Sequence, residues 1–339
     1  MPFHFAIHRT DLSRRRDRCR SAVEQVSKLP REVVTCCNMC GSGRGAVVAT
    51  TDRYGCKLRT AMCLDCGLLY VVDRPTREGY AEFYEKGIYR TLVGEFKGAS
   101  QSTERVRGAQ VYYATTLIAA MQGLLPARRG ARLLDVGGSA GVVARQFADE
   151  FGYEPTLFDP APDEVAEART LGVDACVATI ENFQSERRYD LILLCRTVEH
   201  LFDLRFALCR IRSLLAPGGL FYCDFSDFME VCRREGPPAA TTKVDHCYWL
   251  TQETAPALFQ SMGFEILRIN TTMSPEQVGF LLRSAEPVEL SSPAAGWAEQ
   301  QVRRLREIET DWQRDGQRPL DTLDWLRTKG YRIKQRLAG

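Results

Sequence analysis

The sequence lacks several features that mark specialised classes of protein. It contains no run of about eighteen apolar residues, so we expect no membrane-spanning helix. Its 45 basic and 43 acidic side chains give a formal net charge of only +2, whereas a dedicated nucleic-acid-binding protein usually carries a strong basic excess. Residues 1–16 carry charges but have no apolar core behind them, unlike a signal peptide. These absences together predict a cytoplasmic protein without a nucleic-acid partner.

Cysteine, by contrast, is abundant. Disulfides are rare in the cytoplasm, so thirteen cysteines in such a chain indicate metal ligands or free thiols. Two half-sites share one pattern: CNMCG at residues 37–41 and CLDCG at residues 63–67. Each can present two thiolates from a tight turn, with a glycine where the backbone needs a positive φ, and four thiolates are a preferred ligand set for structural zinc. We therefore predict one zinc ion bound by Cys37, Cys40, Cys63 and Cys66.

Other interpretations of these cysteines stay open. The 22 residues between the two half-sites suit a β-hairpin within residues 46–62, as in a small zinc ribbon. Cys36 could replace Cys37 as a ligand, and Cys56 is a further spare thiol. The cysteines could instead be buried free thiols, or one pair could be a redox motif, although redox motifs occur singly on thioredoxin-like folds. Since the four-cysteine site is closed, we expect its role to be structural.

The most informative segment is ARLLDVGGSAG, residues 131–141. An apolar, strand-like run ends at Asp135, a glycine-rich turn follows, and residues 141–152 are compatible with a helix. Parallel sheets bind nucleotide-type ligands at such turns, where small residues allow the backbone to approach the ligand beside a helix N-terminus. Asp159 ends the next apolar run, at about the separation expected for a ribose-binding carboxylate. An ordinary strand-to-helix turn is the alternative.

The spacing of the glycines distinguishes two families of ligand. A dinucleotide fingerprint requires glycine at positions 137, 139 and 142, and here Ser139 and Val142 occupy two of them. A dehydrogenase is therefore the weaker interpretation. The pattern acid-x-Gly-x-small-x-Gly instead resembles motif I of the class I S-adenosylmethionine-dependent methyltransferases, with Ser139 in place of the usual middle glycine. The resemblance and the position of the second acid predict cofactor contacts at Asp135, Gly137, Gly138, Ser139, Gly141 and Asp159.

The rest of residues 131–286 alternates short apolar runs with helical patterns. This alternation predicts an α/β fold with a doubly wound, Rossmann-like parallel sheet. The almost continuous apolar run at 189–195 is typical of a central strand, and its end places Cys195 and Arg196 at the ligand-binding edge. The run at 214–225 indicates a helix end, a Pro-Gly-Gly turn and a fifth strand. A terminal antiparallel hairpin follows.

The order of motifs extends the resemblance to residues 33–285. A four-cysteine module, a Tyr-rich segment at 75–90 and motif I together resemble bacterial zinc-containing sugar C-methyltransferases and methyltransferases of polysaccharide clusters. The resemblance implies that Tyr89 lies near the cofactor or substrate, with a core aromatic as the alternative. It also implies that Ile180 and Glu181 contact the adenine.

Only four histidines are present, and two fall in segments that match these enzymes. His200 matches the Glu-His pair after the fourth strand, and its alternative role is structural. His246 matches a segment after the fifth strand where the sugar enzymes place acid–base residues, with Asp245 in place of their glutamate. The resemblance implies that His246 is a general base and that Asp245 and His200 support it. A histidine that titrates near neutrality can accept the proton that a carbon or hydroxyl nucleophile must lose.

Composition and pattern divide the chain into five expected segments: a basic helical arm (1–32), a zinc ribbon (33–74), a helical linker or lid (75–130), a cofactor-binding domain (131–286) and a helical tail (287–339). The tail is expected to form two helices separated by residues 315–319. It could cover the core, form a homodimer or bind a membrane surface. The tail leaves no room for the larger C-terminal domain of the sugar enzymes, which argues against a nucleotide-sugar substrate.

The sequence therefore predicts methyl transfer from S-adenosylmethionine to a sugar, glycan or small natural-product acceptor, at carbon or oxygen. A non-catalytic module that senses the cofactor or recruits a partner through the ribbon is the alternative. Residues 195–200, CRTVEH, contain no Asn-Pro-Pro-Tyr-like motif, so protein or nucleic-acid methylation is less expected. No second metal-binding pattern is recognisable, so a magnesium-dependent mechanism is not predicted.

Overall fold

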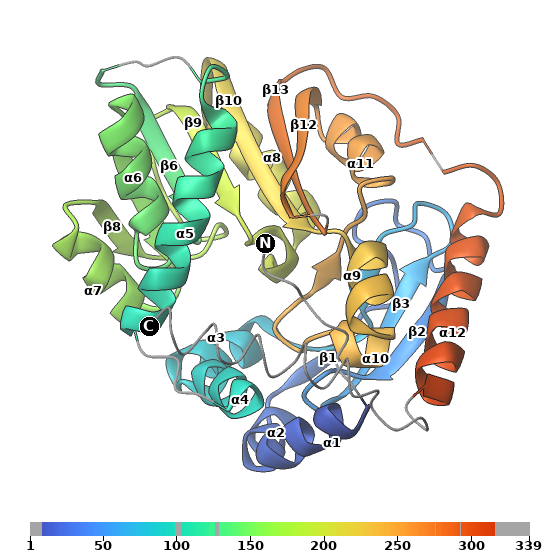
Figure 1. Cartoon of the computed structure of the whole chain (residues 1–339). Coiled ribbons are helices and arrows are strands. Elements are labelled where there is room, and N and C mark those ends of the chain that lie inside the picture. Colours follow the sequence, from blue (N-terminus) through green and yellow to red (C-terminus); the bar gives the residue numbers. More distant parts are fainter. Residues whose placement is uncertain (1–8, 99–102, 126–128, 275, 292, 316–339) are drawn as a thin grey trace.

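The structure, a computed structural model, describes residues 9–98, 103–125, 129–274, 276–291 and 293–315 (Figure 1). The first eight residues of the expected arm and the second helix expected in the tail lie outside the described residues. The described chain forms a seven-stranded sheet, a four-stranded sheet and a two-stranded sheet. No helix of the described residues is long and apolar enough to cross a membrane.

The seven-stranded sheet has the order β12-β13-β10-β9-β6-β7-β8. Its strands from β10 to β8 are parallel, and β12 and β13 form the antiparallel hairpin at one edge. The predicted doubly wound fold is thereby confirmed. The strands are β6 (Arg132–Val136), β7 (Glu154–Asp159), β8 (Asp174–Val177), β9 (Tyr189–Cys195), β10 (Leu215–Ser226), β12 (Phe264–Ser274) and β13 (Gln277–Ser284).

Alternating apolar residues give this sheet two buried faces. Leu133 and Leu191 belong to one core, while their neighbours Leu134 and Ile192 belong to the other. This period of two is the geometry of a strand covered on both sides. Helices α5 (Thr103–Met121), α6 (Val142–Phe151) and α7 (Pro162–Thr170) pack on the first face (Figure 1). Helices α8 (Leu204–Leu214) and α11 (Ala255–Ser261) pack on the second.

One expected detail of the fifth strand is wrong. The Pro-Gly-Gly sequence does not form a separate turn before the strand but lies within β10, which begins at Leu215. The register between β10 and β9 shifts between Leu215 and Leu220, so the extra residues form an irregularity in the ladder. A bulge of this kind absorbs proline and glycine without ending the strand.

The cysteine-rich segment forms the expected hairpin and extends it. Strands β2 (Gly45–Thr51), β3 (Lys57–Cys63) and β4 (Leu69–Val71) run antiparallel. The fourth strand, β11 (Tyr248–Trp249), pairs with β4, although it comes from the far side of the seven-stranded sheet in sequence. Beside this sheet, β1 (Arg31–Val33) pairs with β5 (Asp73–Pro75).

The remaining helices lie around the ribbon, and two of them, α3 and α4, form the part of the expected lid segment that is called the lid below. They are α1 (Arg9–Arg18), α2 (Arg20–Ser27), α3 (Arg77–Glu85), α4 (Ile88–Lys97), α9 (Phe228–Glu235), α10 (Pro238–Thr241), α12 (Trp297–Asp315) and the 3₁₀ turn η1 (Val198–His200). Helices α1 and α2 pack on α4, and α12 packs on β2, β3 and α9 (Figure 1). The apolar stripe of α12, with Trp297, Val302 and Leu305, is buried within the chain and is not free to form a dimer contact.

The basic arm uses two of its arginines to bind the chain itself. Arg16 Nη2 donates to the carbonyl oxygens of Asp52, at 2.6 Å, and Ala239, at 2.7 Å. Arg18 donates to two carbonyl oxygens at the end of α4, at 2.8 and 2.9 Å. These guanidinium groups therefore fasten the arm to the ribbon and the lid.

Candidate functional site

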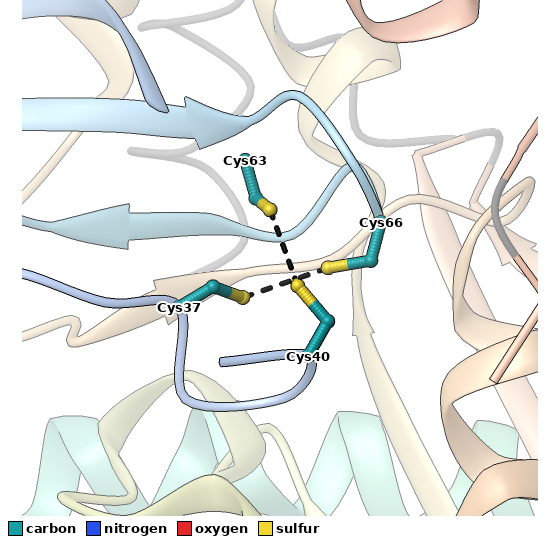
Figure 2. A group of neighbouring side chains, drawn as sticks. All are labelled: Cys37, Cys40, Cys63 and Cys66. Carbon is teal, nitrogen blue, oxygen red and sulfur yellow. Dashed lines mark hydrogen bonds between the residues drawn. The ribbon is translucent and has the colours of Figure 1, made fainter. Parts of the chain in front are cut away.

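Four sulfur atoms converge where the two cysteine half-sites meet (Figure 2). The Sγ atoms of Cys37 and Cys66 are 3.5 Å apart, as are those of Cys40 and Cys63. All four lie within 4.8 Å of one another. Four thiolates at about 2.3 Å from a tetrahedral zinc ion would lie about 3.8 Å from each other. Both 3.5 Å separations are close to this value, so the cluster has about the size of a tetrahedral thiolate site.

The two half-sites have the same backbone geometry. The N–H of Gly41 donates to the Cys37 carbonyl at 2.9 Å, and that of Gly67 donates to the Cys63 carbonyl at 3.0 Å. Both glycines have positive φ, 74° and 77°. The N–H of the first cysteine in each half-site also donates to the carbonyl five residues later, at 2.8 and 2.9 Å. Each glycine is thus needed for the turn that aims two sulfurs inward.

The structure also decides between neighbouring cysteines. Cys36 is exposed and lies outside the cluster, so Cys37 is the candidate ligand. Cys56 is buried elsewhere in the ribbon. Hydrogen bonds of the Cys66 thiol with the sulfurs of Cys37 and Cys63, together with burial, raise the pKa of this thiol. Four thiols packed in this way ionise together only with a cation among them, so the donor set fits a thiophilic metal ion.

The second candidate site is the glycine-rich loop between β6 and α6. Asp135, at the end of β6, is buried, and neither carboxylate oxygen has a hydrogen-bond partner of normal geometry among the described residues. A Cβ on Gly138 would lie 2.6 Å from this carboxylate and 2.4 Å from Leu157. Gly137 and Gly141 have φ of 68° and 75°. The loop therefore passes directly over a buried acid that the Ala144 N–H approaches without a hydrogen bond of normal geometry, which favours a polar ligand at this position.

Ser139 adopts the left-handed backbone conformation that the loop needs, although the usual residue at this position is glycine. Its φ is 50°, a left-handed conformation that is uncommon for a residue with a Cβ. Its N–H donates to Asp159 Oδ2 at 3.0 Å, and Ala161 N–H donates to Asp159 Oδ1 at 2.9 Å. Its Oγ donates to Glu164 Oε2 at 2.8 Å, and Glu164 forms an ion pair with Arg90 of the lid. Hydrogen bonds thus offset the backbone strain.

Asp159 retains the capacity to bind a ligand. Each of its oxygens accepts one backbone N–H, so a lone pair on each is left for ribose hydroxyls. Burial raises the pKa of Asp159 to about 6, although the two N–H donors oppose this effect. The carboxylate is therefore ionised at neutral pH.

The other expected cofactor contacts surround the same edge of the sheet. The Ile180 side chain is buried, and Glu181 forms an ion pair with Arg77 of α3 at 2.7 Å. Cys195 ends β9, and Arg196 follows with a φ of 52° and an exposed side chain. The lid thus reaches the expected adenine segment through a charged contact.

Tyr89 projects from α4 of the lid. Its ring lies 5.4 Å from that of Tyr84 and 5.9 Å from that of Phe83, and its side chain is half-buried. Burial raises the pKa of Tyr89, and the negative charges of Asp245 and Asp159 raise it further. Tyr89 packs on Tyr84, which contacts His200, and the next residue, Arg90, pairs with Glu164, the partner of Ser139. The ring is also part of an aromatic cluster, so a contact with the cofactor or substrate and a role as a core aromatic both remain open.

Two histidines that are far apart in the sequence meet beside Asp245. The rings of His200 and His246 pack edge to face, with centroids 4.6 Å apart. Asp245 Oδ2 lies 3.8 Å from His200 Nδ1 and 3.7 Å from His246 Nε2. One ligand atom of each residue lies within 4.8 Å of the others, so this trio could also hold a metal ion. Such a ligand set was not recognisable in the sequence, because 45 residues separate the two segments.

The two rings differ in environment. Burial lowers the pKa of His246 well below its usual range, and the charge of Lys243 lowers it further. His246 is therefore neutral at pH 7. His200 is more exposed, and its Nδ1 lies 2.8 Å from the Asp245 carbonyl oxygen. A carbonyl only accepts, so Nδ1 is the donor in this contact and the ring presents Nε2 on its other side.

Two further side chains belong to this cluster. The Tyr84 hydroxyl lies 3.4 Å from His200 Nδ1, and Lys243 Nζ lies 3.4 Å from His246 Nε2. Sequence reasoning missed both, although Tyr84 stands in the same Tyr-rich segment as Tyr89 and Lys243 precedes His246 by three residues. Burial lowers the pKa of Lys243, and its amine lies against the ring nitrogen that a metal ion would use, which favours an acid–base cluster over a metal site.

Comparison with known proteins assigns the central part of the chain. Residues 109–269, from α5 to β12, match the model of a family described as a methyltransferase domain. A ubiquinone biosynthesis O-methyltransferase of Nitrobacter winogradskyi is 33% identical over 97 residues, which cover 27% of this chain and 37% of the relative. The chain thus spans little more than a third of that relative's length.

Solved structures with the same kind of fold include two S-adenosylmethionine-dependent methyltransferases. That of Clostridium acetobutylicum has a TM-score of 0.42 and 14% identity, and covers 51% of this chain and 91% of its own. That of Mesorhizobium loti has a TM-score of 0.41 and 17% identity, and covers 49% and 96%. The family match confirms the predicted Rossmann-like methyltransferase fold, and the four cysteines lie outside the matched residues.

Proposed function

We propose that this chain transfers a methyl group from S-adenosylmethionine to a sugar, glycan or small natural-product acceptor, at carbon or oxygen. The observation that supports the proposal most strongly is the loop over Asp135. A buried, unpaired carboxylate and a loop that no larger residue could follow at Gly138 lie within a methyltransferase domain. The histidine pair with Asp245 supplies acid–base groups from the turn after β9 and from the loop between α10 and β11.

The chain's own residues would divide the binding of the cofactor. The loop from Gly137 to Gly141 would approach it closely, and Asp159 would accept from its ribose hydroxyls. Ile180 and Glu181 would flank the adenine, while Tyr89 would close the site from the lid. When bound, S-adenosylmethionine would supply a methyl group that its sulfonium already makes electrophilic. The protein therefore has mainly to position the acceptor and remove its proton.

His246 is the proposed general base. Its pKa lies well below the near-neutral value expected from the sequence, because the ring is buried, so the imidazole is unprotonated at neutral pH. Asp245 Oδ2, 3.7 Å away, would stabilise the imidazolium once a proton is accepted. His200 is the second candidate, because its Nδ1 contact with the Asp245 carbonyl leaves Nε2 free on a more exposed ring. The two candidates predict different variants to be inactive.

Paired substitutions separate these roles. We expect His246→Ala to slow the release of S-adenosylhomocysteine by about 10²–10⁴-fold while the affinity for S-adenosylmethionine stays parental. The assay would use nucleotide-linked sugars, oligosaccharides and phenols as acceptors, with melting temperature as the check on folding. Near-parental turnover in His246→Ala would remove it as the base. A rate loss confined to His200→Ala would assign the base to His200.

The name of the Nitrobacter relative supports oxygen methylation as the first reaction to test. Methylation of a sugar carbon is the second candidate, since it rests on the four-cysteine module and on Asp245 and His246. A non-catalytic, cofactor-sensing module is the alternative that would follow if every acceptor failed. We propose a cytoplasmic location, since none of the thirteen cysteines forms a disulfide, as in a reducing compartment.

We also propose that Cys37, Cys40, Cys63 and Cys66 hold one structural zinc ion. The matching sulfur separations and the repeated backbone turns support this proposal. The division into an arm, a ribbon, a lid, a cofactor-binding domain and a tail is proposed on the same sequence boundaries. Binding of the basic termini to a membrane or to a second copy of the chain is a further proposal, although Arg16 and Arg18 already bind within the chain.

A further inference from the structure

Residues 242–247, which include Asp245 and His246, form a loop that we call the acid–base loop. Hydrogen bonds attach it to the ribbon at both of its ends. It lies between α10 and β11, and its neighbours on either side contact strands or turns of the four-cysteine sheet. These contacts involve backbone groups, so they set the path of the loop independently of the side chains it carries.

The first attachment is the turn between β2 and β3. Asp52, at this turn, is fully buried. Its Oδ1 accepts from the N–H groups of Tyr54, Gly55 and Cys56 at 2.8 to 2.9 Å, which closes the turn. Its Oδ2 accepts from the N–H of Val244 at 2.9 Å, which holds the residue next to Asp245. One carboxylate thus joins the tip of the ribbon to the acid–base loop.

Two neighbouring contacts reinforce the same junction. The N–H of Arg53 donates to the Thr242 carbonyl at 2.9 Å. Arg16 Nη2 bridges the carbonyl oxygens of Asp52 and Ala239, at 2.6 and 2.7 Å. The arm, the ribbon tip and the start of the loop therefore form one hydrogen-bonded junction.

The second attachment follows His246 directly. The N–H of Val71, at the end of β4, donates to the Cys247 carbonyl at 3.0 Å, and β11 then pairs with β4. The N–H of Cys247 donates to the Glu199 carbonyl at 2.7 Å, next to His200. Asp245 and His246 thus lie between two attachments, both supplied by the ribbon sheet.

The cysteine cluster lies at the opposite end of β3 from the Asp52 turn. Strand β3 runs from Lys57 to Cys63, so at about 3.3 Å per residue the two ends are about 20 Å apart. The half-site at residues 63–67 also forms the turn from β3 to β4. A metal ion there cannot touch the reacting atoms, but it fixes both strands that carry the attachments.

We propose that the four-cysteine ribbon is a positioning element for the acid–base loop, with Asp52 as its positioning residue. The ribbon holds Asp245 and His246 against His200, and the metal acts by fixing β3 and β4. The functional meaning of this role rests on the proposed methyltransferase activity. The glycine-rich loop from Gly137 to Gly141 lies between β6 and α6, and neither of these elements carries one of the attachments.

Asp52→Asn tests the junction, because it removes the acceptor of the Val244 N–H and keeps an oxygen that can close the turn. An asparagine oxygen can still close the turn by accepting from residues 54–56, but its amide group cannot accept from Val244 N–H. We expect amide hydrogen exchange at residues 244–246 to quicken by about ten-fold, the effect of losing one buried hydrogen bond. The affinity for S-adenosylmethionine, measured by calorimetry, should stay parental. The full-length protein with its metal is used throughout.

Asp73→Asn is the matched control. Asp73 lies in the same part of the chain but forms a partly exposed ion pair with Arg59, so its loss should leave exchange at residues 244–246 unchanged. Arg16→Gln gives a second test if Asp52→Asn folds poorly, because it weakens the same junction from outside and should also quicken exchange there. Parental exchange at these residues in a folded Asp52→Asn, or equal quickening in Asp73→Asn, would overturn the proposal.

Turnover separates this proposal from the proposed function. If the ribbon positions the loop and His246 is the general base, both Asp52→Asn and His246→Ala slow methyl transfer and leave the KM for S-adenosylmethionine unchanged. If the loop loosens in Asp52→Asn but His246→Ala keeps parental turnover, the assignment of His246 fails and the positioning role stands. If His246→Ala is inactive while Asp52→Asn keeps both parental exchange and parental turnover, the positioning role fails alone.

Discussion

Ser139 shows how one residue can replace a glycine without changing a loop. Its positive φ costs about 1 kcal/mol in backbone strain, and the bonds from its N–H to Asp159 and from its Oγ to Glu164 offset that cost. The Glu164 bond also continues to Arg90 of the lid. A glycine would have the conformation without strain but no link to the lid.

Substitutions at Ser139 should therefore follow a definite order. We expect Ser139→Ala to lower the free energy of unfolding by about 1–2 kcal/mol, because it keeps the strain and loses the bond to Glu164. Ser139→Gly loses the same bond but relieves the strain, so its stability should lie closer to that of the parent. Urea unfolding measures both. Equal destabilisation by the two variants would show that the serine backbone is not strained.

Asp135 gives the unliganded protein a pH-dependent stability. Burial, and then the charge of Asp159, raises the pKa of Asp135 to about 7, against about 3.9 in an unfolded chain. Between these values the folded state binds a proton that the unfolded state lacks, so stability falls as pH rises, by roughly 1.4 kcal/mol per pH unit.

We therefore expect Asp135→Asn to be more stable than the parent at pH 8, by a margin that shrinks as the pH falls towards 5. Denaturant unfolding without S-adenosylmethionine at several pH values measures the margin. Asp149→Asn, at an exposed position on α6, is the control and should show no such trend. A margin that does not change with pH would contradict the assigned cause.

At the scale of elements, a strand could be predicted when the residues that determine it lie within or next to it in the sequence. The strands from β6 to β9 and the β12–β13 hairpin follow from apolar runs and turn residues, and the β2–β3 hairpin follows from the cysteine spacing. The two-residue strand β11 has no periodicity, and its partner β4 lies far away in sequence, so the pairing is set only by tertiary contact. The prediction of a separate Pro-Gly-Gly turn was wrong because proline and glycine occur in β-bulges as well as in turns, and the sequence does not distinguish the two.

The ribbon is the element with the sharpest chemical prediction. We expect one zinc per chain, and we expect Cys63→Ser to lose it and unfold the ribbon, since metal binding contributes to folding. Cys36→Ser is the matched control, because Cys36 is exposed and lies outside the cluster. Elemental analysis of protein purified without chelator should give about one equivalent in the parent and the control. Well under half an equivalent in the parent would contradict the zinc assignment.

At the scale of the whole molecule, the ribbon and the second face of the large sheet share one hydrophobic core. This core includes Met62 and Leu69 from the ribbon together with Ile192 and Phe280 from the sheet. Sequence boundaries suggest separate modules because composition changes along the chain. The continuity of the core could not be predicted, because it depends on which apolar faces meet after folding.

The candidate site also has parts that the sequence predicts and parts that depend on tertiary contacts. The cysteine ligands and the glycine-rich loop were predictable, because each is a local motif whose spacing carries its geometry. The contacts of His200 with Tyr84, and of His246 with Lys243, were not, because they join segments from the lid, η1 and the loop before β11. Local motifs thus gave the cofactor side of the site and the resemblance named the two histidines and Asp245, but only the fold gave their contacts with Tyr84 and Lys243.

Calorimetric titration with S-adenosylmethionine, beside NAD, tests the central claim most directly. We predict that the parent binds S-adenosylmethionine and not NAD, and that Asp159→Ala weakens binding by about 1–3 kcal/mol by removing the acceptor of the ribose hydroxyls. Asp163→Ala, at an exposed position on α7, should bind like the parent. Binding of NAD without S-adenosylmethionine would contradict the account, and parental affinity in Asp159→Ala would remove that carboxylate from the site.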